Sequence, residues 1–183
     1  MTDNRTDYDK VLEFYTAFKQ DEFIPSKDKK ASLDKDTISE DRLSLKMDLI
    51  AEEFIELIEA VYGLKAAQEL EEGWLKAKSL DDGTRDIVGA ADALGDMRYV
   101  ISGLEIESNI PSTLIFDEIH KSNLSKLDDN GDPILSDGIT PAVHDGKIKP
   151  KGKILKGENY FEPDLQAIID GQEPDRTPEL KNK

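Results

Sequence analysis

Apolar residues recur at helical spacing over the first two thirds of the chain. One series predicts a first helix over about residues 6–19; its members are Val11, Leu12, Phe14, Tyr15 and Phe18. A longer series predicts a second helix, which Ser39 opens and Gly63 ends: Leu43, Met47, Ile50, Phe54, Leu57, Ile58 and Val61. The polar segment between them contains Pro25 and is interpreted as a loop. Three further helices are predicted over residues 64–78, 85–106 and 111–127.

The pattern changes after residue 127. Residues 128–165 hold the turn signals "DDNGDP", "SDG", "HDGK" and "KGENYFEP", separated by short extended pieces. This segment is predicted to be a basic loop or β-hairpin arm, and residues 166–183 a flexible tail. We therefore expect an all-α protein, a four- to five-helix bundle over residues 1–127 with an arm attached.

Composition narrows the kinds of partner and metal site. Asp and Glu number 40 against 24 Lys and Arg, a formal charge of −16 that disfavours nucleic acid polymers and anionic membranes. The chain shows neither a secretory signal nor an apolar run of membrane-spanning length, so a cytoplasmic location without membrane contact is expected. There is no cysteine, and the histidines are His120 and His144, which excludes thiolate and multi-histidine sites. Any metal would be bound by oxygen.

Carboxylates cluster on the second predicted helix. The stretch "AEEFIELIEA" places Glu52, Glu56 and Glu59 within about 60° of one another, with Glu53 beside them. Ile50, Phe54, Leu57 and Val61 centre on the opposite side, so the pattern is typical of an ordinary amphipathic surface helix that buries the apolar side and leaves the glutamates in solvent. Leu45 and Leu49 lie on the glutamate side, however, which indicates that this side is covered.

The fourth predicted helix carries an isolated acidic pair. Asp92 and Asp96 lie four residues apart on a helix otherwise rich in small and apolar residues. Burying them would be costly without a cation, which Arg98 or a lysine could also supply. If this helix faces the second one, the carboxylates form an oxygen cage suited to Mg²⁺, with Mn²⁺ as an alternative ion. The predicted metal ligands are Glu52, Glu53, Glu56, Asp92 and Asp96.

Positive charge is concentrated near the arm. The stretch "GKIKPKGKILKG" contains no acidic residue and five lysines: Lys147, Lys149, Lys151, Lys153 and Lys156. Just before the arm, "HKSNLSK" offers His120, Lys121, Asn123 and Lys126. Such a segment beside an acidic helical body is complementary to metal-chelated polyphosphate, although a solvated lysine-rich loop gives the same pattern.

Together these motifs resemble the all-α nucleoside triphosphate pyrophosphohydrolases, which include MazG-like proteins, dimeric dUTPases and phosphoribosyl-ATP pyrophosphohydrolases. The family pattern E-E-x-x-E matches Glu52, Glu53 and Glu56, and the final aspartate of E-x-x-D matches Asp96. Ala93 stands at the glutamate position of the second motif, so Asp92 would have to replace it. The C-terminal "SNLSK" and "LKG" resemble the extension of phage and bacterial members.

The resemblance implies an enzyme that hydrolyses a nucleoside triphosphate to the monophosphate and pyrophosphate with Mg²⁺. Glu53 and Glu56 would be catalytic. Substrate would be bound by Asn123, Lys126, Lys156 and Tyr99. A homodimer or dimer of dimers is also implied. Two alternatives remain open, a non-catalytic helical module that binds nucleotide or protein, and hydrolysis of phosphoribosyl-ATP.

Overall fold

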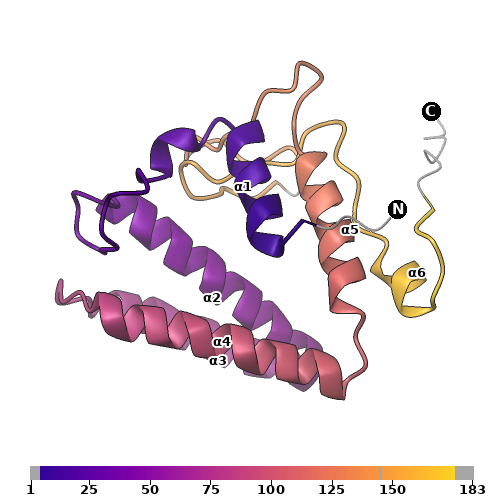
Figure 1. Cartoon of the computed structure of the whole chain (residues 1–183), viewed down its shortest axis with the longest axis horizontal. Helices are drawn as coiled ribbons and strands as arrows, with labels where there is room; N and C mark the ends of the chain where they lie inside the picture. The colour runs from indigo at the N-terminus through magenta and orange to yellow at the C-terminus, as the bar shows by residue number, and fades with distance from the viewer. Residues whose placement is uncertain (1–4, 145, 176–183) are drawn as a thin grey trace. The chain divides into compact units, whose positions relative to one another are not determined.

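The structure is a computed structural model that describes residues 5–144 and 146–175. Within them the chain forms six α-helices and a short 3-10 helix, and no strand is present (Figure 1). The helices are α1 (Asp7–Ala17), α2 (Glu40–Tyr62), α3 (Leu64–Lys78), α4 (Ile87–Glu107), α5 (Ser112–Leu124) and α6 (Leu165–Ile169), with η1 at Asp21–Phe23. The predicted all-α class is confirmed. No described helix combines the length and apolar character that crossing a membrane requires.

The chain divides into two compact units, described separately below. One comprises Met1–Ile24 and Leu94–Lys183, and the other Pro25–Ala93. Helix α4 runs from the second unit into the first. This division does not follow the boundary expected at residue 127, and the assignment of residues 1–127 as a catalytic domain stays a prediction.

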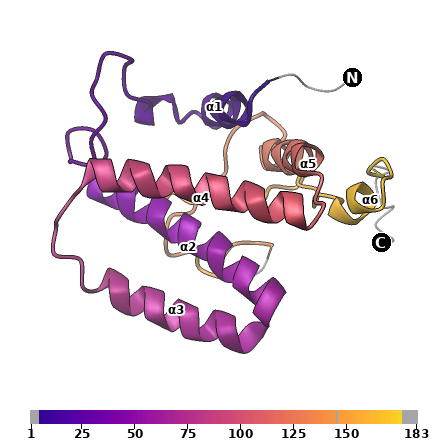
Figure 2. The ribbon, with the colours of Figure 1, turned by 60° about the horizontal axis from the view of Figure 1, so that its bottom comes forward.

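The unit Pro25–Ala93 is built on a helical hairpin of α2 and α3 (Figure 2). The Ser39 hydroxyl accepts a hydrogen bond from the Arg42 amide at 3.3 Å, which caps the start of α2. Gly63 adopts a φ of 89°, a conformation that costs other residues energy, and it turns the chain into α3. Asp48 then joins the two helices, accepting from Trp74 Nε1 at 3.2 Å and from Lys78 Nζ at 2.5 Å.

The apolar stripe of α2 is not the face that α3 covers. The side chains predicted to form the buried side are 37–58% exposed: Ile50, Phe54, Leu57 and Val61. Buried instead are Leu45 on α2 and Ala67 on α3. Leu45 lies on the side that carries the glutamates, so the expectation that this side is covered holds for its first turns.

The other unit contains a polar interface between α1 and α5. Lys10 is 1% exposed and pairs with Asp117, and its ammonium also lies 5.8 Å from the centroid of the Phe116 ring. One turn further along each helix, the His120 ring lies 2.8 Å from Glu13. At the end of α1, Phe18 is buried and stacks on Phe14. Ionic contacts therefore join α1 to α5.

The arm, residues 128–165, folds back on itself, and its described residues form no strand. A hairpin was one of the two predicted forms of this arm. The structure has instead two isolated antiparallel bridges, which pair Leu135 with Ile154 and Pro141 with Ile148. Serines of α5 fix the returning chain, because Ser122 Oγ donates to the Phe161 carbonyl at 2.8 Å and Ser125 Oγ accepts from the Phe161 amide at 3.1 Å. The loop form of the arm is the one observed.

Helix α6 lies inside the range predicted to be a tail. The Asp164 side chain caps it by accepting from the Ala167 amide, and Ile168 is buried. Ordered structure thus continues past residue 165 because a buried isoleucine anchors this turn. The remainder of the predicted tail, residues 176–183, lies outside the described residues.

Because the pair of Lys10 and Asp117 is buried, we expect it to contribute far more to the free energy of unfolding than an exposed Lys–Asp pair of the same unit. Asp117→Asn removes the charge that offsets a buried ammonium, so we expect it to lower the free energy of unfolding in urea by about 3 kcal/mol. The matched control is Asp132→Asn, whose lysine partner Lys19 is exposed, with an expected loss below about 0.5 kcal/mol. Equal losses in the two variants would show that the Lys10 pair is not a structural requirement.

Candidate functional site

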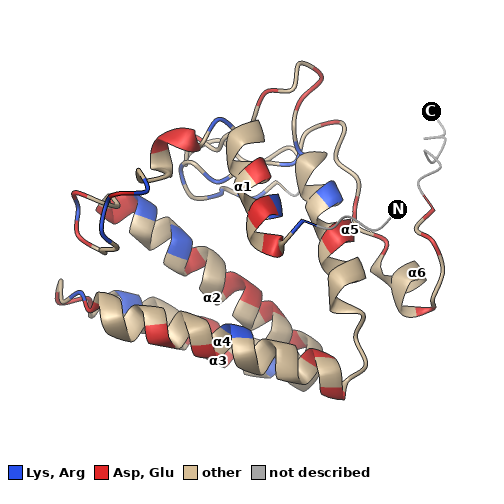
Figure 3. Ribbon diagram, in the orientation of Figure 1, with Lys and Arg blue, Asp and Glu red and all other residues tan. Residues whose placement is uncertain are grey.

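The predicted acidic ligands of α2 lie on its C-terminal half (Figure 3). Helical spacing places Glu52 and Glu56 on one face, with Glu53 one position round from Glu52. Glu52 is half-buried, whereas Glu53 and Glu56 are exposed. Three carboxylates are thus presented along one helix, all of them within the unit Pro25–Ala93.

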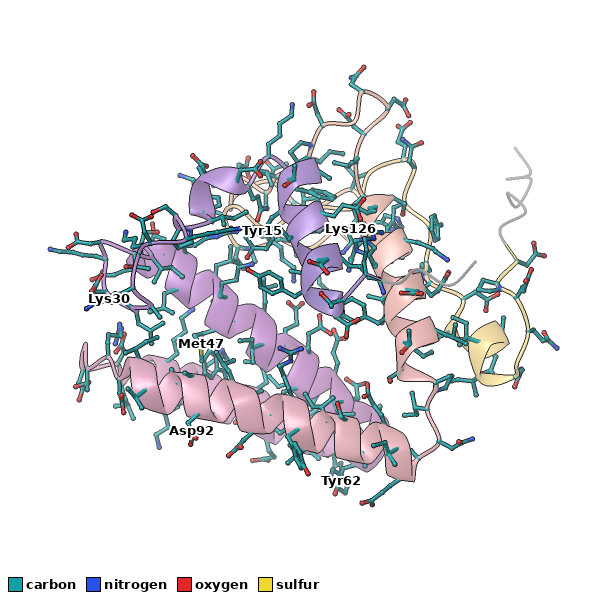
Figure 4. The ribbon with its side chains drawn as sticks, viewed as in Figure 1. Tyr15, Lys30, Met47, Tyr62, Asp92 and Lys126 are labelled. Atoms are coloured by element: carbon teal, nitrogen blue, oxygen red, sulfur yellow. The ribbon has the colours of Figure 1, made fainter. Side chains whose placement is uncertain are left out.

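Helix α4 carries the other two predicted ligands. Asp92, labelled in Figure 4, and Asp96 lie one turn apart and both are exposed. Tyr99, predicted to contact substrate, is 82% exposed. The sequence favoured a metal because burying an acidic pair would be costly. No residue of α4 is buried in the described chain, so this cost does not arise.

The donor chemistry of these residues fits Mg²⁺, because carboxylate oxygens are the protein ligands this ion takes. The set is divided between the two units, with Asp96 in one and the remaining four in the other. In the part of the chain that the structure describes, no three Asp, Glu or His side chains form a group able to hold a metal ion. The metal site stays a prediction.

The predicted phosphate-binding residues, in contrast, belong to one unit. Lys126, labelled in Figure 4 just beyond the end of α5, donates from Nζ to Asn123 Oδ1 at 2.6 Å. The returning arm meets the same place at Gly157, where a Cβ would lie 3.2 Å from the Lys126 carbonyl oxygen and 3.3 Å from that of Leu127. Lys156 directly precedes this contact. The fold therefore brings "SNLSK" and "LKG" together although about thirty residues separate them.

Lys156 is held by side chains of its own segment. Its ammonium lies 4.3 Å from the centroid of the Tyr160 ring and 3.6 Å from Glu162 Oε1, and the side chain is 38% exposed. Partial burial opposes the charged form, but hydrogen bonding and charge from Tyr160 and Glu162 outweigh it and raise the pKa of Lys156. This lysine is therefore charged at neutral pH and partly accessible to an anion.

His120 does not belong with the phosphate-binding residues. It was grouped with Lys121, Asn123 and Lys126 because all lie in one basic stretch. The structure instead buries His120 against Glu13, and its hydrogen bond, together with that of Arg5, lowers the pKa of the Glu13 carboxyl. Its neighbour Lys121 is exposed. The histidine serves the contact between α1 and α5.

Sequence reasoning missed two residues of this region. Gly157 was noted only as part of a Lys-Gly pair, and nothing in the sequence separates it from glycines that merely turn the chain. Tyr160 carried no signal at all, although its spacing of four from Lys156 permits a contact once the chain turns. Both depend on how the arm returns to α5, which local sequence does not encode.

Comparisons with known proteins agree with this fold. The sequence profile of the phosphoribosyl-ATP pyrophosphohydrolase family matches residues 12–123, more than half of the chain. A solved structure of a protein assigned as an NTP pyrophosphohydrolase, from Exiguobacterium sp. 255-15, is similar with a TM-score of 0.59 and 23% identity. The similarity covers 92% of this chain and 96% of that one. Curated proteins give no match.

The profile match spans α2 and α4, the helices that carry the acidic motifs, and most of α5. It decides between the enzymatic prediction and the non-catalytic module, in favour of a hydrolase. The chain belongs to the phosphoribosyl-ATP pyrophosphohydrolase family and hydrolyses pyrophosphate bonds.

Proposed function

We propose that the protein is a Mg²⁺-dependent nucleoside triphosphate pyrophosphohydrolase. One water is added across the bond between the α- and β-phosphates, giving the nucleoside monophosphate, pyrophosphate and a proton. The observation that carries the proposal is the backbone contact of Gly157 with Lys126, which brings the segment of Lys156 to the end of α5, where Lys126 donates to Asn123. A polyphosphate chain offers enough negative charge to engage both lysines at once.

The acidic residues have a separate role in this proposal. Glu52, Glu53, Glu56 and Asp96 would hold the metal, assisted by Asp92. A bound Mg²⁺ would offset phosphate charge and lower the pKa of water. Glu53, exposed on α2, would orient that water and accept its proton. Tyr99, also exposed, would contact the base.

The arm favours a free nucleotide over phosphoribosyl-ATP. The family profile ends at residue 123, before Lys126 and the arm. The Exiguobacterium protein leaves only about 15 residues of this chain unmatched, fewer than the arm contains, so its fold extends into this segment. That protein is assigned to nucleoside triphosphates, which supports the same class of substrate here. Phosphoribosyl-ATP remains the second candidate because the family profile carries its name.

The proposal also includes association with a second copy of the chain. Helix α4 exposes a series of large apolar side chains, among them Val88, Val100 and Ile106 at 76%, 64% and 78%. An exposed apolar surface of this kind marks an interface. Since α4 carries Asp92, Asp96 and Tyr99, burying it against a partner would also enclose proposed site residues. We therefore propose a homodimer or a dimer of dimers.

The catalytic role of the E-E-x-x-E motif predicts different outcomes for two neighbouring glutamates. Pyrophosphate release is first measured with Mg²⁺ on a panel of ribo- and deoxynucleoside triphosphates. With the best substrate, we expect Glu56→Gln to lower kcat about 100-fold or more, because a charged ligand becomes neutral. Far-UV circular dichroism should be unchanged.

Glu59→Gln is the matched control. Glu59 is exposed one turn further along the same helix but lies outside the motif, so this variant should keep near wild-type activity. Equal turnover by both variants would contradict the assignment of Glu56. Activity that persists after the metal is chelated would contradict the dependence on Mg²⁺.

The proposed interface predicts an effect of charge on α4. Val100→Asp should convert the dimer or tetramer into a monomer in sedimentation equilibrium, because a carboxylate buried in an apolar interface is costly. Val143→Asp is the control, since Val143 lies on the arm and is fully exposed. A wild-type protein that is monomeric at micromolar concentration would overturn the proposal.

A further inference from the structure

Tyr160 lies where it can control the position of Lys156. The Lys156 ammonium is 4.3 Å from the centroid of its ring, within the range of a cation–π contact. The His144 ring makes a T-shaped contact with the same ring, with centroids 5.6 Å apart. The ring is therefore occupied by two neighbours, one of them a lysine proposed to bind phosphate.

The backbone around Tyr160 is fixed to the end of α5. Its amide donates to the Gly157 carbonyl at 3.2 Å, which closes a turn and returns residue 160 towards residue 156. Hydrogen bonds to Ser122 and Ser125 hold the next residue, Phe161. The preceding residue, Asn159, donates to Asp129 at 2.9 Å. The ring thus stands on an anchored segment, whereas the lysine side chain is long and flexible.

An anchored ring matters because an acidic neighbour competes with it for the Lys156 ammonium. Glu162 lies 3.6 Å from the ammonium, but the Glu162 side chain is 77% exposed, so water screens this pair strongly. A ring presents no such negative charge to an incoming phosphate. It can restrict the lysine before binding without repelling the ligand, and less conformational entropy is then lost when phosphate arrives.

We infer that Tyr160 is a positioning residue whose ring holds the Lys156 ammonium ready to receive the polyphosphate of the substrate, on the segment that Gly157 brings against the backbone of Lys126. This inference rests on the proposed function for the identity of the substrate. Tyr160 acts through Lys156, by the face of its ring and by the hydrogen bond of its hydroxyl. Binding, rather than the chemical step, depends on it.

Kinetics of substitutions at Tyr160 test the inference. Tyr160→Leu should raise KM for the nucleotide about fivefold, equivalent to about 1 kcal/mol, with kcat within twofold of wild type. Tyr160→Phe keeps the ring but loses the hydroxyl, so its KM should lie between those of wild type and Tyr160→Leu. In a Lys156→Met background, Tyr160→Leu should add nothing, because the group it positions is gone. An equal rise in that background, or an effect of Tyr160→Phe as large as that of Tyr160→Leu, would overturn the inference.

Two further measurements do not require turnover. Proton NMR of the nucleotide-free protein should show upfield-shifted Lys156 side-chain methylene signals in wild type and Tyr160→Phe, but not in Tyr160→Leu. Calorimetric titration with inorganic tripolyphosphate should show the weakest binding for Tyr160→Leu. If the wild type hydrolyses no nucleotide, the proposed function fails, and these two results still decide the role of Tyr160. Unshifted Lys156 signals in wild type, or equal tripolyphosphate affinity, would overturn it.

Discussion

The close approach of Gly157 to the end of α5 determines how the C-terminal half of this protein is arranged. A side chain at this position would crowd two backbone carbonyls, those of Lys126 and Leu127, and the Ile134 side chain. The serine contacts to Phe161 then hold the chain a few residues later. Between these two attachments lies the short segment with Lys156 and Tyr160. The arm is long and has no strands among its described residues, yet its functional part is fixed at both ends.

Charge explains why such an arrangement is needed. A protein with a formal charge of −16 repels polyphosphate unless positive groups are concentrated where the ligand binds. In the proposed function the arm supplies that concentration, together with Lys126 just beyond α5. The acidic residues of α2 and α4 would repel the same ligand without a cation, so metal and lysines would have complementary tasks. This is why the proposed function requires both parts of the chain.

Much of the fold could be predicted from the sequence because its helices are defined locally. Ser39 and Gly63 mark the ends of α2 by capping and by a positive φ, and periodicity supplies the rest. Which face a helix buries is not local. Phe54 and Val61 were expected inside and are exposed, because α3 packs against another side of α2.

The candidate site likewise has residues that local sequence predicts and residues that it does not. The spacing of Glu52, Glu53 and Glu56 was readable because one helix presents all three. His120 was misplaced because adjacent residues in a helix point about 100° apart, so it turns to α1 while Lys121 faces outward. Tyr160 and Gly157 acquire their roles only when the arm returns to α5, a contact between distant segments.

The most direct measurement identifies the products by ³¹P NMR when the wild-type protein and Mg²⁺ are supplied separately with nucleoside triphosphates and with phosphoribosyl-ATP. We expect equal amounts of monophosphate and pyrophosphate from a nucleoside triphosphate, at a higher kcat/KM than for phosphoribosyl-ATP. Orthophosphate and a nucleoside diphosphate as products, or hydrolysis of phosphoribosyl-ATP alone, would contradict the proposed function.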